Sequence, residues 1–293
     1  MKIINYGSLN IDNVYKVKHF VNPGETASSL GFELHYGGKG LNQSVALALA
    51  GAEVYHAGKI GKDGIFLLEF LESKGANVDN VIIDEREKTG HAIIQVDEGG
   101  ENSILLHSGA NHKIKKNEIV NTLLKFSSKD VLLIQNEINN LSAIINTAAD
   151  MGMYIVMNPS PINESLTKLP LHRINMFVMN LDEARTLTGG KREDTVLRLL
   201  AKKFPTAEFV ITLGKAGSIY YHPRNDIRID IEADEVRNVV DSTGAGDTFL
   251  GYFLAGRVFN QGIKRCLKVA SYAAAISVTR KGAAESIPRV EYP

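Results

Sequence analysis

Residues 240–249 (VDSTGAGDTF) combine the residue types that bind an anion and accept a proton beside it. Gly244 and Gly246 allow a tight turn that points backbone N–H groups in one direction, and a helix that begins there adds partial positive charge. Asp247 places a carboxylate next to this anion site, where it could take a proton from a hydroxyl that attacks a phosphate. A helix start capped by aspartate has the same pattern, so the segment alone leaves both interpretations open.

Polar residues in three other segments also have two interpretations each. Asn10 and Asp12 follow the first strand-like run, and Glu137 follows another apolar run. A carboxylate and an amide at a strand end can bind neighbouring hydroxyls of a polyol, although both residue types are also common in turns. Residues 37–42 (GGKGLN) either lead into a helix or bring backbone close to a ligand, with Asn42 projecting from the first helical turn.

Asn180 and Glu183 are separated by three positions in residues 180–183 (NLDE). This spacing is typical of a capping box, in which the two residues satisfy each other's backbone N–H groups. The same spacing places both side chains at one helix end, where they could orient waters around Mg²⁺. The pattern does not decide between these alternatives.

Apolar runs that alternate with helical patterns predict the elements that must position these residues. Strands are expected at residues 2–7, 53–58, 78–83, 130–135, 154–158, 176–179 and 208–212, and a further strand is expected to lead into residue 241. Helices are expected at residues 41–50, 64–74, 116–126, 141–151, 182–187, 194–203, 248–258 and 262–279. This alternation predicts an α/β fold: a doubly wound, mostly parallel sheet with helices on both faces.

Four further segments do not fit this alternation. Residues 13–19 and 32–36 form short strands around a turn, and residues 90–97 and 102–107 are joined by the hairpin signal 98–101 (EGGE). These segments predict a small antiparallel sheet inserted into the α/β body. A second hairpin is expected from residues 218–222 and 227–232.

Ligands of open parallel sheets bind beyond the carboxyl ends of the strands. The candidate residues follow predicted strands at this edge: Asn10, Asp12, Glu137, Asn180 and Gly214. One cleft could therefore collect them all, with Asp247 at its centre.

Several classes of protein are excluded by the sequence. Lys and Arg together number 33, as do Asp and Glu, so no bulk charge favours nucleic acid or an anionic membrane. Residues 33–40 lack the first glycine and the hydroxyl of a P-loop, and no dinucleotide-binding glycine motif joins an early strand to a helix. Cys266 is the one cysteine and no targeting or membrane-spanning segment is visible, so we expect a cytoplasmic protein.

The motifs together resemble the ribokinase family of carbohydrate and nucleoside kinases, over residues 7–288. The resemblance is carried by GSLNID at 7–12, PGET at 23–26, GGKGLNQ at 37–43, NLDE at 180–183, DSTGAGD at 241–247 and VTRKGA at 278–283. The segments at 37–43 and 241–247 are the family's signatures. The resemblance implies a single kinase domain over residues 1–293.

The family's catalytic and sugar-binding residues carry over to matching positions. The resemblance implies that Asp247 is the general base and that Gly244, Ala245 and Gly246 form the anion hole for the transferred phosphate. It implies sugar binding by Asn10, Asp12, Gly38, Lys39, Asn42, Glu137 and Asp247. Residues 13–36 and 89–108 would form a lid over the sugar and the interface of a homodimer.

The resemblance also implies three further ligands. ATP and its Mg²⁺ would be bound by Asn180, Glu183, Thr212, Gly214, Gly217, Gly246 and Ser271. A monovalent cation, K⁺ in the family, would be bound by Asp241, Thr243, Ser277, Arg280, Gly282 and Ser286, the middle four through carbonyl oxygens.

The reaction implied is transfer of the γ-phosphate of ATP to D-ribose, giving D-ribose 5-phosphate. Leu41 and Asn136 depart from the family pattern on the sugar side. Another pentose, a ketohexose or a nucleoside therefore remains an alternative acceptor. A sugar-sensing protein that keeps the fold without turnover is the alternative outside the enzymes.

Overall fold

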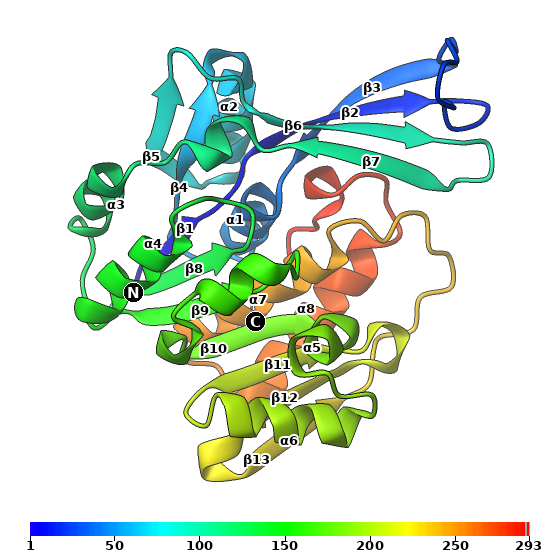
Figure 1. The fold of residues 1–293 in the computed structure, drawn as a ribbon. Coiled ribbons are helices and arrows are strands. Elements are labelled where there is room, and N and C mark those ends of the chain that lie inside the picture. Colours follow the sequence, from blue (N-terminus) through cyan, green and yellow to red (C-terminus); the bar gives the residue numbers. More distant parts are fainter. Residues whose placement is uncertain (291, 293) are drawn as a thin grey trace.

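The protein is built around a nine-stranded sheet with a smaller sheet at one end (Figure 1). The structure, a computed structural model, describes residues 1–290 and 292. The strand order of the large sheet is β13-β12-β11-β10-β9-β8-β1-β4-β5. Its strands are β1 (Ile3–Tyr6), β4 (Val54–Gly61), β5 (Asn77–Asp84), β8 (Val131–Gln135), β9 (Tyr154–Asn158), β10 (Met176–Asn180), β11 (Glu208–Thr212), β12 (Ser218–His222) and β13 (Ile227–Ile231).

The parallel arrangement predicted from the sequence is confirmed. Every pairing from β5 across to β11 is parallel, and β11, β12 and β13 continue the sheet as an antiparallel edge. The side chains of the central strands β1 and β8 are buried throughout, which explains why these strands read as continuous apolar runs. The carboxyl ends of the parallel strands consequently meet along one edge of the sheet.

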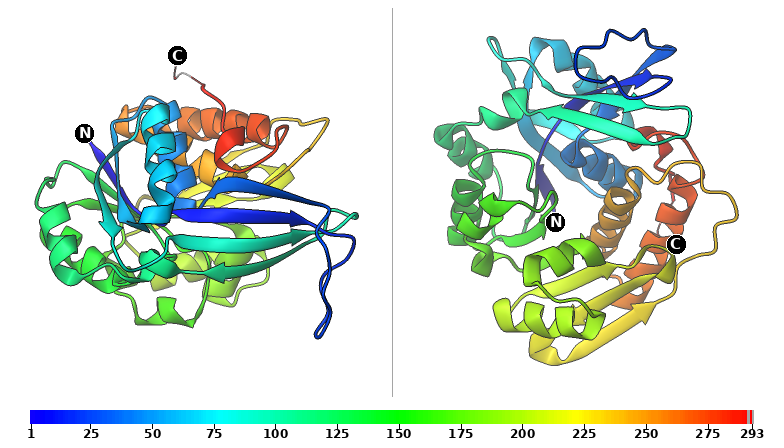
Figure 2. Two further views of the ribbon diagram at one scale, coloured as in Figure 1. Left: turned by 90° about the horizontal axis from the view of Figure 1, so that it is seen from above. Right: turned by 45° about the vertical axis from the view of Figure 1, so that its right-hand side comes forward.

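Helices cover both faces of this sheet (Figure 2). One apolar core lies under α1 (Lys39–Leu49), α2 (Ile65–Lys74), α7 (Ala245–Val258) and α8 (Ile263–Ser277). The other lies under α3 (Lys116–Leu123), α4 (Leu141–Asp150), α5 (Leu181–Thr188) and α6 (Glu193–Lys203). The doubly wound class is therefore confirmed. Within the described part of the chain, no helix has the length and apolar character needed to cross a bilayer.

The second sheet has four strands in the order β3-β2-β6-β7 and projects from one end of the large sheet (Figure 1). It consists of β2 (Asn10–Lys16), β3 (Gly31–Gly37), β6 (Gly90–Val96) and β7 (Asn102–His107). The pairs β2–β3 and β6–β7 are antiparallel hairpins, as predicted. The hairpins join through a parallel pairing of β2 with β6, which the sequence did not indicate because the two strands lie far apart in the chain.

The prediction of a strand that leads into residue 241 is wrong. Residues 232–244 contain no strand, and the chain crosses from β13 to α7 as an extended loop. Val239 and Val240 are 51% and 53% exposed, so they are not part of either core. The backbone N–H groups of Val240 and Asp241 donate to the carbonyl of Val278 at the end of α8, which replaces the pairing that a strand would have made.

Helices α1 and α7 cross at very close range. Gly251 lies in the middle of α7, and an ideal Cβ added to it would lie 2.3 Å from Cβ of Ala46 on α1. Only a residue without a side chain permits this approach. The crossing brings the first turns of both helices, and hence Asn42 and Asp247, to the same place.

We expect Gly251→Ala to lower the free energy of unfolding by about 1–3 kcal/mol, because the added methyl group forces the two helices apart. Urea unfolding followed by circular dichroism measures this change. Gly262→Ala is the matched control, since an ideal Cβ there meets no atom within 4 Å, and its effect should stay below about 1 kcal/mol. Equal effects of the two substitutions would contradict the close-packing role of Gly251.

Candidate active site

Asp247 lies in the first turn of α7 and is only 6% exposed. Its Oδ1 accepts a hydrogen bond of 2.8 Å from Nε2 of Gln43, and its Oδ2 accepts one of 3.0 Å from Nδ2 of Asn42. The helix begins at Gly244, whose φ of 76° is left-handed and whose position has no side-chain cap. The capping interpretation of Asp247 is therefore wrong, because its carboxylate binds amides of α1 instead of the backbone of its own helix.

The turn before Asp247 leaves room for a ligand. An ideal Cβ on Gly246 would meet no atom within 4 Å, so open space adjoins the start of α7. The first N–H groups of a helix have no acceptor within the helix and carry partial positive charge. An anion in this space would therefore lie against Gly246 and close to the Asp247 carboxylate.

Glu137 lies at the carboxyl edge of the sheet, after β8. Its Oε2 accepts a hydrogen bond of 2.5 Å from Oγ of Ser8 and one of 2.9 Å from the backbone N–H of Lys39. Burial raises the pKa of Glu137, and the Ser8 hydrogen bond and the Lys39 charge oppose this shift. The carboxylate of Asp247, followed by those of Glu137 and Glu183, raises the pKa of Lys39, because each favours the ammonium form. Lys39 is thus the positive charge among these carboxylates.

Asp12 reaches the same region from β2 of the second sheet. An ideal Cβ on Gly37 would lie 2.2 Å from Oδ2 of Asp12, so residue 37 must be glycine for this carboxylate to fit. Burial, followed by the negative charge of Glu137, raises the pKa of Asp12 to about 7, while His35 lowers it. His35 also contacts Glu285 at 3.1 Å between Nδ1 and Oε1, which ties the second sheet to the loop after α8.

Asn10 is oriented by Asn111, a residue that sequence reasoning missed. Nδ2 of Asn111 donates to Oδ1 of Asn10 at 2.8 Å and to the carbonyl of Leu9 at 3.1 Å, and Asn111 is 1% exposed. The oxygen of the Asn10 amide is therefore occupied, which leaves its NH₂ group to act as a donor. A polar residue after a strand of the second sheet was the available signal, but nothing in the sequence separated it from an ordinary turn residue.

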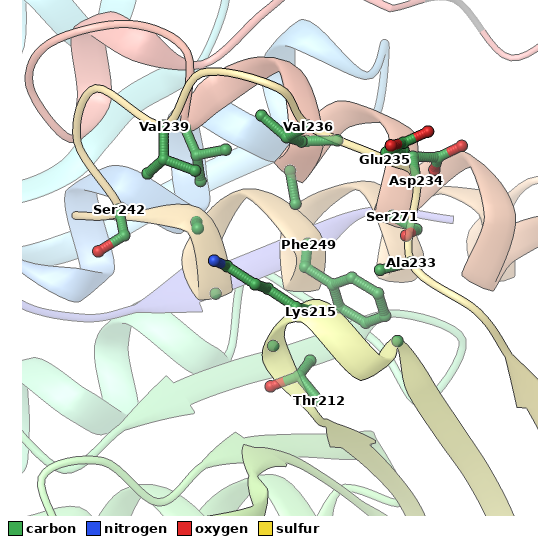
Figure 3. A pocket seen from close by; sticks show the side chains of 17 residues that line it. Thr212, Lys215, Ala233, Asp234, Glu235, Val236, Val239, Ser242, Phe249 and Ser271 are labelled. Atoms are coloured by element: carbon green, nitrogen blue, oxygen red, sulfur yellow. The ribbon is translucent and has the colours of Figure 1, made fainter.

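A cavity of about 520 Å³ lies beside the start of α7 (Figure 3). Five of the residues predicted to bind the nucleotide line it: Thr212, Gly214, Gly217, Gly246 and Ser271. Phe249, Val236 and Val239 add apolar walls, and the side chain of Lys215 extends into the space (Figure 3). Apolar walls with a few polar groups suit a ligand that has an aromatic ring and a charged end. Lys215 lies within the run 212–217 that was expected to line the nucleotide, whereas sequence reasoning missed the three apolar residues.

Asn180 and Glu183 lie outside the lining of this cavity. Oδ1 of Asn180 accepts from the backbone N–H of Glu183 at 2.8 Å, and Oε2 of Glu183 accepts from the backbone N–H of Asn180 at 3.0 Å. The capping box is therefore present. It leaves lone pairs of Glu183 free for water, so it is compatible with the magnesium interpretation. Within the described residues, no three His, Cys, Asp or Glu side chains are grouped as ligands of a metal ion.

Of the residues predicted to bind a monovalent cation, Thr243 and Gly282 hydrogen-bond to Asp241. Its Oδ1 accepts from the backbone N–H and the hydroxyl of Thr243, and its Oδ2 accepts from the backbone N–H of Gly282 at 3.0 Å. Burial alone would raise the pKa of Asp241, but these hydrogen bonds hold it below its usual value. The hydroxyls of Ser277 and Ser286 donate to the backbone carbonyls of Ala274 and Ala283, three residues before each of them.

The sequence matches the pfkB family of carbohydrate kinases over residues 1–290. The chain belongs to this family. It is 34% identical over 292 residues to the ribokinase of Haemophilus influenzae, an alignment that covers 96% of this chain and 94% of that protein. The family predicted from the signatures at residues 37–43 and 241–247 is confirmed.

Solved structures of pfkB-family relatives share the fold. A ribokinase from Cryptococcus neoformans in complex with ADP has a TM-score of 0.86 and 34% identity, covering 98% of this chain and 96% of that one. The Arabidopsis thaliana ribokinase complexed with ribose and ATP has a TM-score of 0.85 and 26% identity, covering 98% and 95%. The described residues therefore reproduce the family fold over nearly the whole chain.

We expect the affinity of this kinase for ribose to rise by up to about tenfold between pH 6 and pH 8. With a pKa of about 7, Asp12 is about 10% ionised at pH 6 and about 90% ionised at pH 8. An ionised carboxylate can accept hydrogen bonds from two hydroxyls, which a protonated one does less well. Isothermal titration calorimetry across this range measures the effect. Asp12→Asn should bind more weakly and without this slope, and an unchanged slope in that variant would assign the titration to another group.

Proposed function

We propose that this protein transfers the γ-phosphate of ATP to a hydroxyl of D-ribose and forms D-ribose 5-phosphate and ADP. The observation that carries the proposal is the position of Asp247. Its carboxylate is buried and hydrogen-bonded to α1, the preceding residues Ala245 and Gly246 line the 520 Å³ cavity, and its charge acts on Lys39, as does that of Glu137. Relatives of this protein that are named ribokinases, one of them complexed with ribose and ATP, support ribose as the acceptor.

Asp247 acts as the general base in this proposal. The attacking sugar oxygen forms a bond to the γ-phosphorus, the bond from that phosphorus to the bridging oxygen breaks, and ADP leaves. The hydroxyl proton passes to the Asp247 carboxylate and then to solvent. Because such transition states are loose, the proton moves late and the orientation of the carboxylate matters more than its basicity. Gly244, Ala245 and Gly246 supply N–H groups to the transferred phosphate.

The sugar would be held by complementary donors and acceptors at its hydroxyls. Asp12 and Glu137 accept hydrogen bonds, and Asn10 donates through the NH₂ group that Asn111 leaves free. Nδ2 of Asn42 donates to Asp247, and its buried Oδ1 has no partner within the described residues, so it can accept from a hydroxyl. Gly38 and Lys39 complete the sugar site.

Two cations belong to the proposal. Mg²⁺ bound to ATP neutralises phosphate charge, and Asn180 and Glu183 would orient its waters. A monovalent cation, K⁺, would be bound by the oxygens around Asp241 and would stabilise the loop next to the anion hole. Thr212, Gly214, Gly217 and Ser271 would line the nucleotide.

A coupled assay of ADP release tests the function directly. Ribose, fructose and several nucleosides are compared as acceptors, each with and without K⁺. Fastest turnover with ribose supports the proposal, whereas a higher kcat/KM for fructose or a nucleoside replaces ribose by that acceptor. A protein that turns over no acceptor but binds ribose would be a sugar sensor.

We expect Asp247→Asn to lower kcat by at least about 100-fold, because the amide cannot take the hydroxyl proton. The KM for ATP should change little, since the nucleotide cavity is intact. Asp182→Asn is the matched control: its side chain is 86% exposed and, among the described residues, forms an ion pair with Arg185 alone, so the kcat of this variant should match that of the unsubstituted protein. Near-normal kcat in Asp247→Asn would refute the assignment of the base.

The second sheet, residues 13–36 and 89–108 in the prediction, serves in this proposal as a lid over the sugar and as a dimer interface within one kinase domain of residues 1–293. Asp12 lies on the face of the sheet that borders the active site. The opposite face carries a row across all four strands, from Leu34 through Asn13 and Ile93 to Leu105. Leu34 and Leu105 are 47% and 69% exposed. An apolar face of this kind supports pairing with a second copy, and the single cysteine fits the cytoplasm.

We expect Leu105→Glu to convert a dimer to a monomer, because a charged side chain would be buried in the interface at the β7 end of this row. Light scattering coupled to size-exclusion chromatography measures the mass. Leu124→Glu is the control, since Leu124 is 67% exposed but lies directly after α3, away from the second sheet. If the unsubstituted protein is a monomer, or if both variants are monomers, the proposed interface is contradicted.

A further inference from the structure

A chain of buried amide side chains runs from Asp247 into the centre of the large sheet. Nε2 of Gln43 donates to Oδ1 of Asp247 at 2.8 Å, and Oε1 of Gln43 accepts from Nε2 of Gln135 at 2.6 Å. Nε2 of Gln135 also donates to Oδ1 of Asn5 at 2.8 Å. All three amides are 0% exposed, so no bulk water competes for these hydrogen bonds.

The orientation of the Asn5 amide is fixed by a hydrogen bond to a backbone carbonyl. Nδ2 of Asn5 donates to the carbonyl of Gly40 at 2.7 Å and to Oγ of Ser44 at 2.8 Å. A carbonyl can only accept, so Asn5 must present its nitrogen to Gly40 and its oxygen to Gln135. The amide of Asn5 cannot turn over without leaving two buried polar groups unpaired.

This orientation passes along the chain. Because Asn5 presents an oxygen, Gln135 must present its NH₂ group, and the second hydrogen of that group then meets Oε1 of Gln43. Gln43 is left with its own NH₂ group facing Asp247. Asn158 supports the same arrangement, since its Nδ2 donates to the carbonyl of Val178 and its Oδ1 faces Nε2 of Gln43 at 3.4 Å.

Glycine at position 7 makes room for this chain. An ideal Cβ on Gly7 would lie 2.4 Å from Oε1 of Gln135 and 2.6 Å from Cα of Gly40. Oε1 of Gln135 itself has no hydrogen-bond partner within the described residues. The orientation of the Gln135 amide is therefore set by the two hydrogen bonds that its nitrogen donates. Its oxygen is left buried and unpaired, which costs free energy.

We propose that Gln135 is a positioning residue for the general base: it holds the Gln43 amide so that its NH₂ group, and never its oxygen, faces Asp247. If the Gln43 amide turned over, Oε1 would lie against the Asp247 carboxylate and push it out of position. The inference rests on the proposed function, because it assigns Gln135 a role only through the proton-accepting carboxylate. Gln135 itself touches neither substrate nor phosphate in this assignment.

The test is a double-mutant cycle on kcat. Gln135→Met keeps the length of the side chain and removes the donor to Gln43, and kcat should fall roughly 10- to 100-fold while KM for ribose and ATP stays within about twofold. In the Asp247→Asn background the same change should alter kcat by less than about twofold, because the base is already absent. Gln135→Glu, which keeps the volume, should repeat the pattern.

The control is Asn80→Leu, which removes a buried amide on β5 that accepts a hydrogen bond from Lys125. In the described part of the protein, Asn80 has no hydrogen bond to Asn5, Gln43 or Gln135. The kcat of this variant should be unchanged. The inference is overturned if kcat is unchanged in Gln135→Met, or if kcat falls equally with and without Asp247. It is also overturned if neither Gln135 variant folds, because Gln135 would then serve the stability of the fold. Absence of turnover in the original protein would instead overturn the proposed function.

Discussion

The crossing of α1 and α7 places two short polar segments from opposite ends of the chain against each other. Gly251 lets the helices approach until the amides of Asn42 and Gln43 reach the Asp247 carboxylate. A carboxylate that is 6% exposed needs such donors, because burying a charge without partners is costly. The proposed anion hole, nucleotide cavity and sugar site all involve residues of these two helices or of segments near them.

Charge in the active site is balanced among groups that cannot all be solvated. Asp12 and Glu137 have raised pKa values because they are buried, and Lys39 has a raised pKa because the carboxylates surround it. This balance of charge would suit the proposed ligands, a sugar that brings hydroxyl donors and, beside α7, a transferred phosphate. The buried amides of Gln43 and Gln135 link Asp247 to the sheet, and they stabilise its carboxylate by hydrogen bonding without adding charge.

Much of the fold could be predicted from the sequence. Strands such as β8 and β9 are short apolar runs between helical patterns, and both local signals survive in the structure. The strand before Asp241 could not be predicted correctly, because two valines look the same whether they pair in a sheet or hydrogen-bond to Val278. The parallel join of β2 to β6 also escaped prediction, since pairing between distant strands leaves no local pattern.

By itself the sequence determined the family, the elements and the chemical types at the strand ends, because glycine turns, apolar periodicity and signature motifs are local. Whether Asp247 caps its helix was left open by the residues alone, and only the packing of α7 against α1 showed that its carboxylate hydrogen-bonds to α1 instead. The same holds for Gln43, Asn111 and Gln135, whose roles depend on partners up to 204 residues away in the chain. The role of an amide side chain depends on its hydrogen-bond partners, and the tertiary structure determines which partners it has.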